Sequence, residues 1–152
     1  MAEPQKVVNN LTAMAPIKAG ALDSLRKALA IVGAANPSPI EKVETVHFAR
    51  WVIFDNGTRL LFAVDFDGPW DEYIDDFIDN AAQGLDLVFG HCDGYPAGGS
   101  KDRDAFKQYV RQHQAADADV LSYSAYPSST VKDIRKGLRV RDTFEALLDL
   151  LQ

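Results

Sequence analysis

Hydrophobic and polar residues alternate along two neighbouring runs, residues 46–54 and 58–66, which are joined by Asn56-Gly57. Both joining residues tolerate the positive φ of a type I′ turn, so the pattern predicts a β-hairpin with a two-residue loop. Side chains alternate along a strand, so with Asp55 opposite Thr58 one face carries the pairs Ile53–Leu60, Trp51–Phe62, Ala49–Val64 and His47–Phe66. The other face carries Val52–Leu61, Arg50–Ala63 and Phe48–Asp65. A slip of one residue would exchange the faces of one strand.

Apolar residues at helical spacing predict helices over about residues 21–32, 69–84 and 102–114. The second of these has an apolar face of Trp70, Tyr73, Ile74, Phe77, Ile78 and Ala81, and an acidic, solvated face of Asp71, Glu72, Asp75, Asp76 and Asp79. After Gly84, a short apolar segment is expected to lead into a glycine-rich loop. Residues 6–17 and 119–127 have strand character, and the tail predicts two short helices, residues 129–138 and 142–151.

The order of these elements predicts an α+β fold of the ferredoxin-like, split-βαβ type. Its four-stranded antiparallel sheet would have helices on one face, with extra helices inserted before and after the last strand. Because no repeat or linker divides the chain, a single domain over residues 1–152 is expected. We expect the more apolar hairpin face, from His47 to Ile53, to lie under the helices. The other face is then open, and it must be wet, covered by the extra segments, or packed against another subunit.

The composition is that of a globular protein, with 47% hydrophobic and 25% charged residues among 152. A net charge of −6 argues against nucleic acid as a partner. The most basic stretch, residues 132–141, is expected on the solvent side of a helix, with a phosphate-binding role as the alternative. No apolar run reaches the roughly 20 residues that span a bilayer, and the N-terminus has no signal pattern. With Cys92 as the single cysteine, we expect a cytoplasmic location.

Three ionisable residues, His47, Arg50 and Asp65, interrupt the apolar hairpin. Arg50 and Asp65 become diagonal neighbours on the open face. They form either an ion pair that holds the sheet or a dimer seam, or a polar anchor in a pocket. His47 near the strand start is either structural or catalytic. If the open face holds an active site, the catalytic candidates are therefore Arg50, His47 and Asp65.

Further candidates follow the second predicted helix, in the stretch "HCDGYPAGGS". His91, Cys92 and Asp93 are adjacent and cannot readily enclose one ion, and no second Cys or His pair has zinc spacing, so no metal site is predicted. His91 could still be an axial haem ligand. Tyr95 in this loop and Tyr123 on the predicted last strand are candidates for substrate binding. Tyr126 is three residues from Tyr123 and would face the other way in a regular strand.

Two stretches, "VVNNLTAM" and "DFDGPWDEYIDDFI", together with the order of elements, resemble the dimeric α+β-barrel superfamily. In that superfamily two ferredoxin-like sheets pack open face to open face, so the resemblance implies a homodimer through the open sheet face. Its haem-degrading members carry an asparagine on the first strand and a histidine ligand after the second helix. The resemblance implies these cofactor-binding roles for Asn10 (or Asn9) and His91, with haem as the cofactor. The second stretch is also similar to small uncharacterised bacterial proteins, some of them associated with haem peroxidases.

Three functions follow as hypotheses. The first is a haem-associated or cofactor-free oxidoreductase with a pocket on the open sheet face, in which the cofactor would supply the redox chemistry. The second is a protein that binds a small apolar or aromatic ligand in the same pocket. The third is an accessory domain without chemistry that binds another protein through its sheet and acidic helix.

Overall fold

The β-hairpin forms in the predicted register. In the computed structural model, which describes residues 6–151, β2 (Val46–Phe54) and β3 (Arg59–Asp67) pair antiparallel from Phe54–Arg59 back to Phe48–Asp65. Asn56 and Gly57 have φ values of 52° and 80°, and the Thr58 N–H donates to the Asp55 carbonyl at 3.1 Å. Glycine is favoured at position 57 because of its φ of 80°, and a Cβ there would also lie 2.7 Å from a methyl group of Leu22, whose side chain would have to move.

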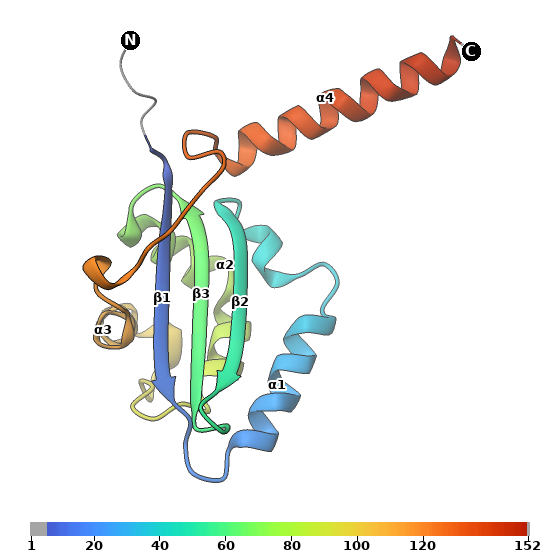
Figure 1. Ribbon diagram of the computed structural model, residues 1–152. Helices are drawn as coiled ribbons and strands as arrows, with labels where there is room; N and C mark the ends of the chain where they lie inside the picture. The colour runs from blue at the N-terminus through green and yellow to red at the C-terminus, as the bar shows by residue number, and fades with distance from the viewer. Residues whose placement is uncertain (1–5, 152) are drawn as a thin grey trace.

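One face of the sheet carries the hydrophobic core. β1 (Val8–Pro16) pairs with β3, which gives the strand order β1-β3-β2. The buried side chains of β3 are Leu60, Phe62, Val64 and Phe66, as predicted for the covered face. They pack against buried residues of α1 (Leu22–Ala34), α2 (Trp70–Phe89) and α3 (Arg103–His113). Figure 1 shows α2 behind the sheet, with α1 and α3 toward its two edges.

The predicted four-stranded sheet is wrong, because the part of the chain described has three strands. Residues 119–127 were expected to form the last strand and do not. Among residues 6–151, backbone hydrogen bonds join this segment to the first strand and the residue before it at two places: Ala115 N–H donates to the Thr12 carbonyl, and the Val7 and Val8 N–H groups share the Pro127 carbonyl. Between these two contacts the segment advances by twelve residues, from 115 to 127, whereas the first strand advances by only five, from Thr12 to Val7. The surplus is taken up by a 3-10 turn, Asp117–Asp119, and by bends, and no ladder forms.

Two helices are longer than predicted. α2 continues through Gly84 to Phe89, because Leu85, Val88 and Phe89 are buried in the core and outweigh the weak helix propensity of one glycine. The tail is one helix, α4 (Val131–Leu150), where two short ones were expected. Further 3-10 turns lie at Pro39–Lys42 and Gly99–Lys101. In Figure 1, α4 projects away from the sheet.

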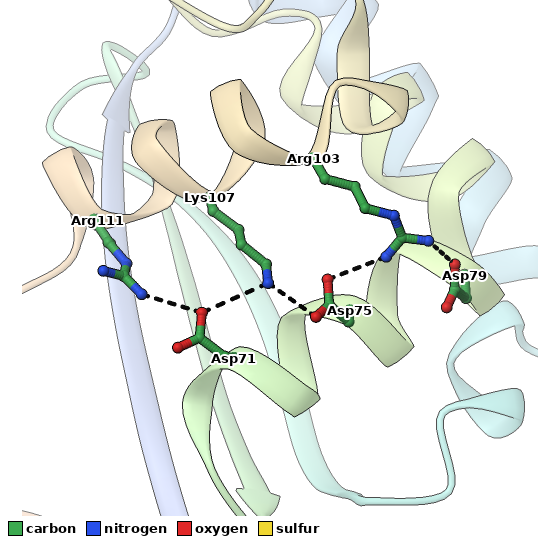
Figure 2. A network of polar contacts seen from close by, with 6 residues as sticks. All are labelled: Asp71, Asp75, Asp79, Arg103, Lys107 and Arg111. Carbon is green, nitrogen blue, oxygen red and sulfur yellow. Dashed lines mark hydrogen bonds and ion pairs between the residues drawn. The ribbon is translucent and has the colours of Figure 1, made fainter.

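The acidic face of α2 is largely exposed, as predicted, and part of it forms ion pairs with α3. Figure 2 shows three of its aspartates facing three cations of α3. Lys107 Nζ lies 2.9 Å from the Asp75 carboxylate and 3.5 Å from that of Asp71. The three cations lie one turn apart on α3 and the three aspartates one turn apart on α2, so the pairs form an ion-pair ladder between the two helices. Its remaining contacts are Arg111 with Asp71, Arg103 with Asp75 and Arg103 with Asp79. The hydrogen bond from Lys107 lowers the pKa of Asp75, and the same bond raises the pKa of Lys107.

Candidate functional site

A groove lies on the open face of the sheet, between the strands and residues 120–127. It consists of three adjoining cavities of about 530, 460 and 240 Å³. Asp65 of β3 and Tyr123 line all three. The largest cavity has a mainly apolar lining that includes Val46, Phe48, Tyr126, Val131 and Ile134. A groove of this size, with apolar walls and a few polar groups, has the general properties of a small-molecule site.

Asp65 is the polar residue at the centre of this groove. It lies on the middle strand, pairs with Asn10 on β1 and Phe48 on β2, and is half-buried. Within residues 6–151 its side chain accepts no hydrogen bond and has no cation within 4.0 Å. A half-buried carboxylate without a partner is unfavourable. It is therefore suited to receive a group that donates a hydrogen bond or carries positive charge.

Arg50 shares the open face with Asp65, as predicted, but the two do not form an ion pair. Arg50 pairs with Ala63 on β3 and is exposed. Its guanidinium has no carboxylate within 4.0 Å among the described residues. It lines the second cavity together with Asp65, Asn10 and Thr12. The first of the two predicted alternatives, an Arg50–Asp65 ion pair, is therefore not formed. Arg50 and Asp65 are instead two separate polar groups along the groove.

A β-bulge changes the position of His47. The prediction paired His47 with Phe66 under the helices, but Val46 takes that place and the register shifts between Val46 and Phe48. Bulges re-aim side chains at strand ends. His47 instead lines the largest cavity, and its Nε2 lies 2.7 Å from Oδ1 of Asp67. Both side chains are only 10% exposed, so the pair is shielded from solvent.

Asp67 positions the groove residue His47, and the sequence did not predict this role. Its second oxygen, Oδ2, accepts the backbone N–H of Val131 at 2.7 Å, at the first residue of α4. A carboxylate is favoured there by the unpaired N–H groups of the helix start. Its position two residues after Asp65 was the available signal, because strand residues two apart share a face. Phe48, Tyr126 and Arg135 also line the largest cavity and were not singled out as site residues.

The wall of the groove comes from the segment that was predicted as a strand. Asn10 Nδ2 donates to Ser122 Oγ at 2.9 Å and ties this segment to β1. Tyr123 is 91% exposed and Tyr126 is 67% exposed. Because the segment is not a regular strand, the expectation that the two tyrosines face opposite ways does not apply, and both line the largest cavity.

His91 lies far from this groove. It follows α2, and its carbonyl accepts the Lys18 N–H just beyond the Pro16 end of β1. Asn10 is six residues from Pro16, or roughly 20 Å along the strand. The Nδ1 atom of His91 lies 2.9 Å from the Leu87 carbonyl, and His91 lines none of the three cavities of the groove. The residues on which haem binding was predicted, His91 and Asn10, are thus not brought together, and they do not fit one haem site.

Tyr95 and Cys92 also lie on the helical side of the sheet. The Tyr95 hydroxyl donates to Asp86 Oδ1 at 2.6 Å, and the same carboxylate accepts the N–H and hydroxyl of Ser100. Burial, followed by the bond to Asp86, raises the pKa of Tyr95 above its usual range. Cys92 is fully buried, and burial raises the pKa of its thiol to about 11. These contacts close the glycine-rich loop against α2, and they separate Tyr95 from the groove to which Tyr123 belongs.

No cluster of three or more His, Cys, Asp or Glu that could hold a metal ion occurs among residues 6–151. Over the same residues, no helix combines the length and apolarity needed to cross a bilayer. The chain matches no protein family model, no curated protein and no solved structure. The resemblance to dimeric α+β-barrel proteins therefore stays a prediction.

Proposed function

We propose that this protein binds a small aromatic or apolar molecule that carries an amine or another hydrogen-bond donor, in the groove on the open face of the sheet. The observation that carries the proposal is the Asp65 carboxylate, which is half-buried, lacks a partner within residues 6–151, and lines all three cavities. A donor group of the ligand would satisfy it with a charge-assisted hydrogen bond.

The walls of the groove support the aromatic part of the ligand. Phe48 is 75% exposed on the floor, and Tyr123 and Tyr126 face solvent on the wall. Large aromatic side chains left exposed on one face commonly mark a binding surface. They would stack on a flat ring, while Asp65 fixes its polar end. Arg50 and Arg135 at the margins are exposed, so water solvates their charges and neither guanidinium needs a ligand to be stable.

A cofactor-free oxidoreductase acting on such a ligand is the second candidate, and one observation favours it. His47 lines the groove and is held by Asp67 at 2.7 Å, with both side chains 10% exposed. A carboxylate that orients an imidazole is the arrangement of a general base. If the pair serves this purpose, aromatic amines should cause oxygen consumption that His47→Gln abolishes. A protein that binds the amines without consuming oxygen would exclude this candidate and leave the binding proposal intact.

The predicted homodimer through the open sheet face is compatible with this proposal only in part. Residues 120–127 already lie along the β1 side of that face. A second sheet would therefore have to approach on the β2 side, where Phe48, Arg50 and Val52 are exposed.

Titration calorimetry with three probes of similar shape tests the proposal: 1-naphthylmethylamine, 1-naphthalenemethanol and 1-naphthaleneacetate. We expect the amine to bind about tenfold more tightly than the alcohol, and the carboxylate most weakly. Asp65→Asn should remove the preference for the amine. Asp76→Asn, the same change at an exposed position on α2, is the matched control and should keep it. Equal binding of all three probes, or an Asp65→Asn variant that keeps the amine preference, would overturn the proposal.

A further inference from the structure

Within the part of the chain that the structure describes, residues 6–151, the C-terminal helix α4 has no partner along most of its length. Every residue from Arg135 to Leu150 is exposed, and no other helix or strand packs along it (Figure 1). It is held at its start only, where Val131 is buried, Thr130 and Asp133 form a capping box, and Asp67 accepts the Val131 N–H. A helix of this length without tertiary contacts is marginally stable in water.

The exposed part of α4 has an apolar seam. Val140, Phe144, Leu147 and Leu151 follow one another at spacings of four, three and four residues, and they are 61%, 58%, 52% and 76% exposed. This is the spacing of the a and d positions of a coiled coil, which place one row of side chains against a facing helix. Leu148 widens the apolar surface on one side of the seam.

The charges of α4 are arranged so that the helix is complementary to an antiparallel copy of itself. Residues 131–140 carry four basic side chains and one acidic side chain, whereas residues 141–150 carry three acidic side chains and one basic one. Within residues 6–151, Arg135, Lys136, Arg139 and Asp149 make no ion pair. Two copies of α4 that run antiparallel bring the basic half of each helix to the acidic half of the other. A parallel arrangement would bring like charges together.

We propose that α4 pairs antiparallel with α4 of a second copy of this chain. Placing Val140 opposite Phe144 of the second copy centres the pair on residue 142. This interface is separate from the open sheet face and goes beyond the proposed ligand binding.

Sedimentation equilibrium of the full chain tests the pairing. The protein should sediment at twice its chain mass of 16.7 kDa. Phe144→Glu combined with Leu147→Glu should convert it to the monomer and reduce its helical circular dichroism. Ala146→Glu introduces one glutamate on the opposite side of the helix and should leave the dimer intact, and Phe144→Glu alone, which adds the same single charge on the seam, should weaken it. The fluorescence of Trp51 and Trp70 checks that the sheet domain still folds. A monomeric wild-type chain, or a dimer that survives the double substitution, would overturn the proposal.

The direction of the pair is tested by a spin-label distance. A nitroxide on Leu150→Cys should give a distance of about 24 Å along the helix axis in the antiparallel dimer. In a parallel dimer the same labels would be about 10 Å apart. A label on Asp142→Cys, near the proposed centre, should give a short distance in both cases and controls for labelling. Short distances at both positions would overturn the antiparallel arrangement.

Discussion

Asp67 joins the groove to the C-terminal helix, because one carboxylate oxygen lies 2.7 Å from Nε2 of His47 and the other accepts the Val131 N–H at 2.7 Å. Asp65, two residues earlier on the same face of β3, has no such partner among residues 6–151. Two aspartates of one strand therefore have different roles. Asp67 stabilises the structure, and Asp65 is available to a ligand.

Asp67→Asn should destabilise the protein by about 2 kcal/mol, since it weakens a charge-assisted hydrogen bond in a shielded site and leaves His47 poorly paired. Asp65→Asn should change stability by less than about 0.5 kcal/mol. Urea unfolding followed by tryptophan fluorescence measures both. Equal losses for the two variants would contradict the division of roles.

The α2–α3 ladder should be a modest, salt-sensitive source of stability. Lys107 touches both Asp71 and Asp75, so Lys107→Met should cost about 1 kcal/mol at low salt, and less when salt screens the network. Unfolding in urea at two salt concentrations measures the difference. Lys101→Met, on an exposed residue outside the ladder, is the control. If the loss of stability in Lys107→Met does not depend on salt, the side chain of Lys107 contributes through packing and not through its charge.

The same ladder predicts how stability depends on pH. The pKa of Asp75 is lowered in the folded protein, so its contribution is present above the usual aspartate pKa of about 3.9 and is lost as the pH falls below it. The pKa of Lys107 is raised, so its contribution is present below about 10.4 and is lost as the pH rises above that value. The stability difference between wild type and Lys107→Met should therefore be greatest between these limits and should shrink on either side.

Tyr95→Phe tests the correction made for that residue. The change removes the hydroxyl that donates to Asp86 and leaves Ser100 as the partner of this carboxylate. We expect a loss of stability of about 1–2 kcal/mol. Binding of 1-naphthylmethylamine should not change, because Tyr95 lies on the helical side of the sheet. Weaker amine binding without a loss of stability would restore the predicted role in substrate binding.

Cys92 should be unreactive in the folded protein. Burial raises the pKa of its thiol to about 11, which leaves only about one thousandth as thiolate at pH 8. Reaction with a disulfide reagent should be slow under native conditions and fast in urea. Fast modification of the native protein would show that the chain around Ile17 and Cys92 opens readily.

The sequence predicted those parts of the fold that depend on local chemistry. Asn56-Gly57 determined the hairpin register, and with it the face shared by Arg50 and Asp65, because few residue pairs adopt a type I′ turn. The bulge at His47 could not be predicted, since it depends on the partner that Asp67 provides across the sheet. The strand expected at residues 119–127 failed for a similar reason. Its apolar and polar residues alternate as in a strand. However, the segment has more residues between its two backbone contacts with β1 than a ladder of paired residues allows.

The candidate site was predicted in part for the same reasons. Asp65, Arg50 and Asn10 do line the groove, because their common face follows from the hairpin register and the position of the first strand. Tyr123 also lines it, although the strand on which it was predicted does not form. Asp67 was missed, although it shares a face with Asp65. The haem role of His91 came from a resemblance, and Tyr95 was a candidate in the glycine-rich loop. The structure holds His91 beside Lys18 and Tyr95 against Asp86 of α2, on the helical side of the sheet and away from the groove.

The most direct test of the central claim is to locate the amine on the protein. In ¹⁵N–¹H spectra, titration with 1-naphthylmethylamine should shift the backbone amides of Ala63, Asp65 and Tyr123, and in Asp65→Asn the same shifts should need about ten times more amine. The amides of His91 and Tyr95 should not respond. Shifts confined to the region of His91 and Tyr95, or shifts in the groove that saturate at the same amine concentration in Asp65→Asn as in wild type, would contradict the account.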